Sequence, residues 1–205
     1  MADESPKSVI EALLFAGSEP VRPGEVREIL SSAAPLADGE IRAIIDQLRE
    51  EYRASGRSFT IAEIAGGYRL QTLPEYGAWI SKLRATPSRR KLSAPAIETL
   101  AIAAYRQPIT KAEIEAIRGV NIDGVIENLM DRDLIEPKGR KQAVGKPHLY
   151  GTTKKFLEHF GLRSIKDLPE IEELRRAAAA GADARDGGAP PREDGRHPAA
   201  PEPLV

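Results

Sequence analysis

The sequence contains no cysteine, only three histidines and no long hydrophobic run. The absence of thiols excludes disulfides, thiolate metal sites and cysteine nucleophiles. No two histidines have the four-residue spacing of a helical zinc site, so we expect no metal and no cofactor. No stretch approaches the roughly 20 apolar residues that span a bilayer, and the acidic first residues do not form a secretory signal. We therefore expect a cytoplasmic protein without membrane contact.

Motifs of common catalytic sites are also missing. The sequence has no Gly-x-Ser-x-Gly elbow. Residues 139–147 approximate a phosphate-binding loop, but five residues separate Gly139 from Gly145 where four are required, and Pro147 stands where a Ser or Thr must bind magnesium. We therefore expect a protein that is not an enzyme.

The composition changes at the C-terminal end. Residues 177–205 include nine alanines, five prolines and four glycines among 29 positions. Such a segment cannot bury enough apolar surface to offset the entropy lost on ordering. We predict that residues 170–205 form a short helix, starting near Pro169, and then a disordered tail.

An internal repeat organises the rest of the chain. Two patterns near the start recur 87 and 88 residues later with the same internal spacing. The first copy reads Ile10-Glu11-x-Leu13 and Pro20-Val21-x-x-x-Glu25-Val26-x-x-Ile29, and the second reads Ile97-Glu98-x-Leu100 and Pro108-Ile109-x-x-x-Glu113-Ile114-x-x-Ile117. A shared spacing of this length indicates a duplicated unit.

Each unit is predicted to contain three helices and a β-hairpin. The first has helices from Ser5-Pro6 to Gly17, from Pro23 and from Asp38 to Gly56, a hairpin over 59–72 with its turn at Gly66-Gly67, and a short closing helix over 76–83. The second has helices from Ser93-Ala94-Pro95, from the capping box Thr110-x-x-Glu113 to Gly119 and from Asn121, a hairpin of residues 134–136 and 148–150, and a short helix capped by Thr153.

This order of elements predicts a mainly helical α+β chain of two tandem winged-helix domains. The first covers residues 1–83 and the second covers residues 93–169, with a basic linker over 84–92. Helical spacing predicts the following inward-facing residues: Val9, Ile10, Leu13, Leu14, Val26, Ile29, Leu30, Ile41, Ile44, Ile45, Leu48, Ile97, Leu100, Ala101, Ala104, Val125, Ile126, Leu129, Met130, Phe156, Leu157 and Phe160. Units of about 75 residues have small cores, which favours association with a partner.

Charge on the two third helices argues against groove binding. Residues 38–53 carry five acids against three bases, and residues 121–136 carry five acids against one. A recognition helix in DNA must approach two rows of phosphates, and binding draws on their neutralisation by Lys and Arg. We therefore interpret these domains as winged helices that recognise protein.

Basic residues gather instead in the second hairpin, which we call the second wing. Arg140, Lys141 and Lys146 are candidates for weak contact with a nucleic-acid backbone. A solvated loop and contact with an acidic partner segment are the alternatives that the sequence leaves open.

The second unit resembles the segregation and condensation protein B family. The residues that carry this resemblance are Glu98-Thr-Leu-Ala-Ile-Ala-Ala-Tyr105-Arg106-Gln107-Pro108-Ile109-Thr110-Lys-Ala-Glu113-Ile114, Ile117-Arg118-Gly119-Val120, Gly145-Lys-Pro147, Leu149-Tyr150-Gly151-Thr152-Thr153 and Phe156-Leu157. The first unit matches more loosely, in Glu11-Ala-Leu-Leu-Phe15 and Gly67-Tyr68-Arg69-Leu70.

The resemblance implies an accessory subunit of the bacterial condensin complex. In that family the first domain forms a homodimer and the second binds a kleisin, segregation and condensation protein A, which bridges a structural-maintenance-of-chromosomes ATPase. The implied role is chromosome condensation and segregation at the nucleoid, with DNA contacted at most weakly or indirectly. The residues expected at or beneath the kleisin-binding surface are Tyr105, Arg106, Arg118, Tyr150 and Phe156. Leu14 and Phe15 are the candidates for dimerisation.

The fold alone also permits a winged-helix transcription regulator. The basic second wing is the feature that favours this alternative. Tight, sequence-selective DNA binding that survives moderate salt would distinguish a regulator from a protein adaptor, because nonspecific phosphate binding falls steeply with salt.

Overall fold

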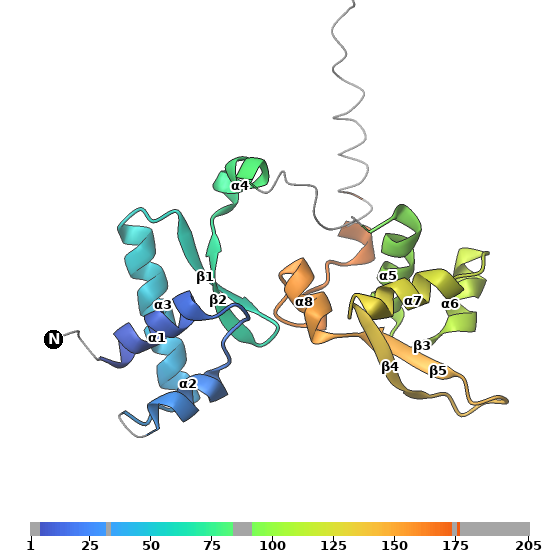
Figure 1. Ribbon diagram of the computed structural model, residues 1–205, viewed down its shortest axis with the longest axis horizontal. Coiled ribbons are helices and arrows are strands. Elements are labelled where there is room, and N and C mark those ends of the chain that lie inside the picture. The colour runs from blue at the N-terminus through green and yellow to red at the C-terminus, as the bar shows by residue number, and fades with distance from the viewer. Residues whose placement is uncertain (1–4, 32–33, 84–91, 174–175, 177–205) are drawn as a thin grey trace, which may run out of the picture. The chain divides into compact units, whose positions relative to one another are not determined.

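The computed structural model describes residues 5–31, 34–83, 92–173 and 176 (Figure 1). Most of the predicted linker and the predicted tail over 177–205 lie outside the described residues. Each predicted unit has its own hydrophobic core under its own small antiparallel sheet, so the α+β prediction of two winged-helix domains is confirmed. In the described part of the chain, no helix has both the length and the apolar character needed to cross a membrane.

The first domain places three helices before its hairpin. Its elements are α1 (Pro6–Ala16), α2 (Pro23–Leu30), α3 (Asp38–Ala54), β1 (Phe59–Ile64), β2 (Gly67–Thr72), the 3-10 turn η1 (Pro74–Tyr76) and α4 (Gly77–Leu83). Strands β1 and β2 pair from Phe59 opposite Thr72 to Ile64 opposite Gly67.

Side-chain caps explain where the first helices begin. The Ser5 hydroxyl accepts a hydrogen bond from the Ser8 amide, and Pro6 occupies the first helical position, as predicted. The carboxylate of Glu25 accepts the Arg22 amide at 2.7 Å before α2. The carboxylate of Glu40 accepts the Ala37 amide at the same distance before α3. These bonds satisfy amides that have no partner inside a helix.

The turn of the first hairpin lies one residue earlier than predicted. Ala65 and Gly66 both have positive φ angles, of 52° and 74°, as the two central residues of a tight hairpin turn require. Gly67 is the first residue of β2 and lies against Pro20, where a β-carbon would be only 2.8 Å from the Pro20 carbonyl oxygen. The second glycine therefore permits close packing and does not shape the turn.

The core of the first domain draws on all three long helices and both strands. Its buried members are Ile10, Leu14, Val26, Leu30, Ile41, Ile45, Leu48, Tyr52, Ile61 and Tyr68. Ile29 was predicted to join them but is exposed. The closing helix α4 exists, but none of its residues is buried.

The second domain repeats the order of elements and adds a strand. Its elements are α5 (Ala94–Arg106), β3 (Ile109–Thr110), α6 (Lys111–Arg118), α7 (Asp123–Asp131), β4 (Ile135–Arg140), β5 (His148–Thr152), α8 (Lys154–Phe160) and the 3-10 turn η2 (Ile165–Asp167). The strand order is β3-β5-β4, so the unpredicted β3 pairs with the second strand of the wing.

The predicted caps of this domain are present. The Thr110 hydroxyl accepts the Glu113 amide while the Glu113 carboxylate accepts the Thr110 amide, which completes the capping box of α6. The Thr153 hydroxyl accepts the Phe156 amide at the start of α8. Gly119 ends α6 in the left-handed region, with a φ of 71°.

The predicted inward face of α5 is partly wrong. Ile97 and Ala101 are exposed, whereas Ala96, Thr99 and Ala103 are buried beside Leu100 and Ala104. Thr99 can occupy the inner face because its hydroxyl donates to the Pro95 carbonyl and accepts a hydrogen bond from a neighbouring arginine. A polar residue whose donor and acceptor are both hydrogen-bonded can be buried in a core, but an apolar sequence pattern does not reveal it.

We predict that Gly67→Ala destabilises the first domain by about 1–3 kcal/mol, because its new methyl group would meet backbone atoms that cannot rotate away. The matched control is Gly39→Ala in α3, where nothing lies within 4 Å of the new atom. That control leaves stability unchanged or raises it by up to about 1 kcal/mol. Urea unfolding measures both, and equal stabilities for the two variants would contradict the packing described.

Candidate partner-binding surfaces

A glutamine side chain joins the end of α5 to the sheet of the second domain. The Gln107 carbonyl oxygen accepts the Thr152 amide at 2.7 Å and the Thr152 hydroxyl at 3.1 Å. Its amide nitrogen donates to the Ala104 carbonyl at 3.1 Å. Gly151 permits this approach, because a β-carbon there would lie 2.8 Å from the Gln107 oxygen. The last turn of α5 and strand β5 are thus held together.

We call the hydrogen bonds of Gln107 to Thr152 and Ala104 the Gln107 bracket. Three of the predicted kleisin-binding residues lie in the segments that it joins. Tyr105 and Arg106 are the last two residues of α5, directly before Gln107. Tyr150 lies on β5, opposite Ile109 of β3. Both tyrosines are partly buried and Arg106 is exposed. Amphipathic tyrosine and arginine at the edge of a core are the residue types enriched at protein interfaces. We call Tyr105, Arg106 and Tyr150 the α5–β5 surface.

Arg118 does not belong to this surface. Its guanidinium donates to the Pro95 carbonyl at 2.8 Å and to the Thr99 hydroxyl at 2.6 Å, and it forms an ion pair of 2.9 Å with Glu98. Its side chain is only 13% exposed. Pro95 lies in the first turn of α5, ten residues or ~15 Å along the helix from Tyr105. Arg118 therefore ties α6 to the start of α5, which corrects the expectation of a shared site.

Phe156 is also not a contact residue. It is buried in the core of the second domain, and its ring centroid lies 4.7 Å from that of Phe160 on the same helix. Phe156 therefore lies beneath the surface of the domain, where it packs with the other core residues. On the same helix, Phe160 is exposed.

The basic residues of the second wing and of the adjoining helix α8 are partly paired within the domain. Four of the six bases between residues 138 and 155 form ion pairs with acids: Lys138 with Glu136, Lys141 with Glu113, Lys154 with Glu158, and Lys155 with Asp133. Arg140 donates to the Lys146 carbonyl at 3.1 Å. In the residues that the structure describes, only Arg140 and Lys146 of this set lack a carboxylate partner. Of the three candidates for contact with a nucleic-acid backbone, Lys141 is thus neutralised within the domain, whereas Arg140 and Lys146 are not.

Glu113 is the centre of this wing's attachment. Its carboxylate accepts hydrogen bonds from the Lys141 ammonium and from the amide and hydroxyl of Thr110. These bonds stabilise the charged form and lower the pKa of Glu113 to about 2. One carboxylate thus caps α6 and anchors the far end of β4.

In the first domain, the two predicted dimerisation residues have different environments. Leu14 is 2% exposed and belongs to the core, so it is not available for a partner, which corrects that prediction. Phe15 is 83% exposed. The neighbours differ because adjacent helical residues are turned by about 100°, so one faces the core and the next faces solvent.

Phe15 borders a hollow of about 290 Å³ on the first domain, which we call the Phe15 hollow. It is lined by Ser8, Glu11, Ala12, Phe15, Tyr52, Phe59 and Leu70. The rings of Tyr52 and Phe59 meet edge to face with centroids 5.1 Å apart. The sequence analysis missed Tyr52, although it continues the stripe of buried residues on α3 with helical spacing.

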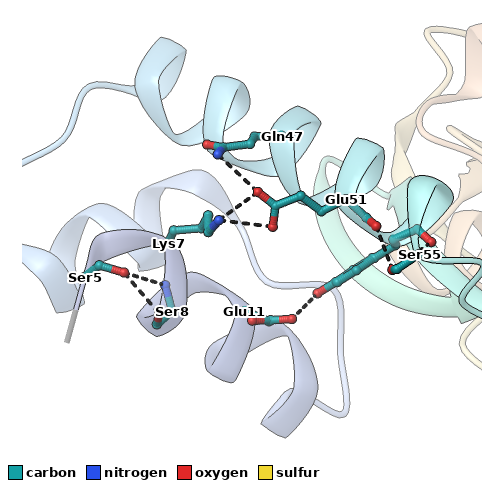
Figure 2. Close-up of polar contacts among 8 residues, drawn as sticks. Ser5, Lys7, Ser8, Glu11, Gln47, Glu51 and Ser55 are labelled. Atoms are coloured by element: carbon teal, nitrogen blue, oxygen red, sulfur yellow. Dashed lines mark hydrogen bonds and ion pairs between the residues drawn. The ribbon is translucent and has the colours of Figure 1, made fainter. Parts of the chain in front are cut away.

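Two residues that line the hollow, Glu11 and Tyr52, belong to the group of polar contacts drawn in Figure 2. The Tyr52 hydroxyl donates to the Glu11 carboxylate at 2.7 Å. The Glu51 carboxylate accepts hydrogen bonds from the Lys7 ammonium and the Gln47 amide. Burial and the nearby Glu11 carboxylate raise the pKa of the Tyr52 hydroxyl well above its usual range. Tyr52 therefore stays protonated and fixes the orientation of Glu11.

Chemistry at a metal is not indicated by the described residues. Among them, no three His, Asp or Glu side chains gather where they could hold a metal ion. Every buried side-chain polar atom of this part of the chain has a hydrogen-bond partner.

Comparison with known families assigns the chain to one of them. The family model of the segregation and condensation complex subunit ScpB matches residues 8–171. The chain belongs to the ScpB family. Segregation and condensation protein B of Symbiobacterium thermophilum is 47% identical over 166 residues, covering 81% of this chain and 74% of the relative. Segregation and condensation protein B of Brevibacillus brevis is 43% identical over 181 residues, covering 85% of this chain and 91% of the relative.

The chain also has similarity to solved structures. The chain is similar to ScpB from Mycobacterium tuberculosis, with 32% identity over 77% of this chain and 95% of that one, at a TM-score of 0.36. It is also similar to a crystallised dimer of an ScpB N-terminal domain complexed with an ScpA peptide, with 28% identity over 42% of this chain and 95% of that one, at a TM-score of 0.35. As an ScpB protein, the chain is an accessory subunit of the segregation and condensation complex.

We predict that Arg118→Ala destabilises the second domain of this ScpB protein by about 1–3 kcal/mol, because the Thr99 hydroxyl loses a charged partner. Arg118→Lys recovers only part of that loss, because one ammonium cannot make the same forked set of bonds. Thermal unfolding followed by circular dichroism measures both. A fully stable Arg118→Ala protein would show that the bonds of Arg118 to Pro95 and Thr99 contribute nothing to stability.

We predict that the Glu113 carboxyl titrates near pH 2, far below its usual range, and that Lys141→Ala raises this pKa. Because the folded pKa is lowered, the contribution to stability is complete above the ordinary glutamate pKa and is lost as the pH falls toward 2. Carboxyl carbon chemical shifts across an acid titration measure the pKa. An unchanged Glu113 titration in Lys141→Ala would exclude the ion pair as the cause.

Proposed function

We propose that this ScpB protein is a non-catalytic adaptor of the bacterial condensin complex. Its first domain forms a homodimer, and its second domain binds the central part of the kleisin, segregation and condensation protein A. The kleisin in turn joins it to a structural-maintenance-of-chromosomes ATPase at the nucleoid. ATP hydrolysis belongs to that partner.

The α5–β5 surface is the observation that carries the kleisin proposal. The Gln107 bracket joins the end of α5, which carries Tyr105, to β5, which carries Tyr150. Both are partly buried, and Arg106 beside them is exposed. Partly buried tyrosines lose little conformational entropy when a partner covers them, which suits them as anchors of an interface.

Charge favours a protein partner over DNA. On α7, the helix that corresponds to a recognition helix, Asp123, Glu127 and Asp131 are exposed. Phosphates would be repelled by these carboxylates. The wing offers partial compensation, since Lys138 and Lys141 are paired with acids of the same domain while Arg140 and Lys146 are not. The acidic α7 is therefore the feature that weighs against the regulator alternative.

Calorimetric titration with a central segment of the cognate kleisin tests the proposal. We expect Tyr105→Ala and Tyr150→Ala to weaken binding by at least tenfold, because each removes a large apolar contact from the interface. The matched control is Phe160→Ala, which removes a 48% exposed aromatic from α8 of the same domain. It should bind as tightly as the unaltered chain.

Circular dichroism separates lost contacts from lost folding in these variants. Folded Tyr105→Ala and Tyr150→Ala proteins that bind the kleisin segment at the original affinity would contradict the proposed surface. Weakening by Phe160→Ala alone would move the site to α8.

A further inference from the structure

Helix α4 presents an apolar face that nothing in the described chain covers. Trp79 is 68% exposed and Leu83 is 80% exposed, and Tyr76 just before the helix is also exposed. These residues follow one another at helical spacings of three and four, so they share a face. A helix of seven residues is marginal in water without a partner. The exposed face therefore has the character of a contact surface.

The Phe15 hollow is the complementary feature of the same domain. Its wall combines aromatic and aliphatic side chains, with Phe15 exposed at its border. At about 290 Å³ it falls just below the ~300–1,000 Å³ typical of small-molecule pockets. An open hollow of this size suits one large side chain. Trp79 of the same chain does not fill it, since that residue is exposed and is not part of the lining.

Charges on the two surfaces are also complementary. Helix α4 carries one basic residue, Lys82, and no acidic one. The Lys82 ammonium lies 4.8 Å from the centroid of the Trp79 ring, so both would approach a partner together. Glu11 lines the Phe15 hollow and also the neighbouring hollow of about 380 Å³ that contains Glu51. Of these two acids, Glu51 is already paired with Lys7, whereas Glu11 accepts the neutral Tyr52 hydroxyl and has no ion pair with any described residue.

We propose that Trp79 of one copy of the chain inserts into the Phe15 hollow of a second copy, with Lys82 facing Glu11. In a twofold dimer the same contact occurs twice, because each copy supplies both the helix and the hollow. This inference rests on the proposed homodimer and assigns its contact residues.

The area available agrees with a dimer. Trp79 and Phe15 from both copies supply four aromatic side chains, each burying roughly 150–250 Å² when covered. Together they would provide about half of the ~1,600 Å² of a standard stable interface. The remaining area would come from Tyr76, Leu83 and the rim of the hollow.

Trp79 is the only tryptophan of the chain, so its fluorescence reports on the proposed contact directly. The experiment dilutes the full chain while recording its mass by light scattering, its emission maximum and its quenching by acrylamide. We expect dimer formation to shift the emission to shorter wavelength and to protect Trp79 from acrylamide, with the same midpoint as the change in mass.

Phe15→Ala tests the acceptor, and its matched control is Ile29→Ala, which removes an exposed aliphatic from α2 of the same domain outside the hollow. We expect Phe15→Ala to raise the dimer dissociation constant at least tenfold and to leave Trp79 exposed in any dimer that remains. Ile29→Ala should change neither value. Lys82→Glu should weaken the dimer several-fold, because it places like charges together at Glu11.

The possible failures are distinguishable. A dimer in which Trp79 stays fully accessible to acrylamide would overturn the inference while the proposed homodimer stands. A chain that remains monomeric at all concentrations would overturn both. Protection of Trp79 only after a kleisin segment is added would assign α4 to that partner and would equally overturn the inference.

Discussion

The amount of apolar surface that each domain can bury is the constraint on which this structure depends. Each winged helix encloses only about a dozen side chains between three helices and a small sheet. Domains of this size bury a smaller fraction of their surface than larger ones and are correspondingly marginal. Large apolar residues therefore remain outside both cores, notably Phe15 and Trp79 in the first domain. Their exposure is the physical reason to expect that the chain functions in contact with other proteins.

In the second domain, the hydrogen bonds that hold the fold together involve residues next to those proposed to bind a partner. Gln107 and Arg118 act at opposite ends of α5, where the first holds β5 and the second holds α6. Glu113 then attaches the wing to the start of α6. The family motif around these residues is thus explained largely by the bonds that build the domain. Tyr105 and Tyr150 are the residues of that motif that we propose to contact the kleisin.

The sequence was sufficient to predict element order, the helix caps and the wing hairpin, because these depend on local chemistry such as the Thr110–Glu113 box. It was insufficient where tertiary contacts decide. Thr99 faces inward because Arg118 reaches it from another helix. Strand β3 has two residues and exists only through its pairing with β5. Helical spacing had already placed Leu14, but not Phe15, on the inner face of α1, and the packing of α1 confirms that only Phe15 is exposed.

The most direct test of the account is the mass of the full chain in solution, measured by light scattering alone and with the central segment of its cognate kleisin. The account predicts a dimer whose mass rises when the kleisin segment is added, because the first domain is proposed to form the homodimer and the second to bind the kleisin. A species whose mass does not change when the kleisin segment is added would contradict the adaptor function.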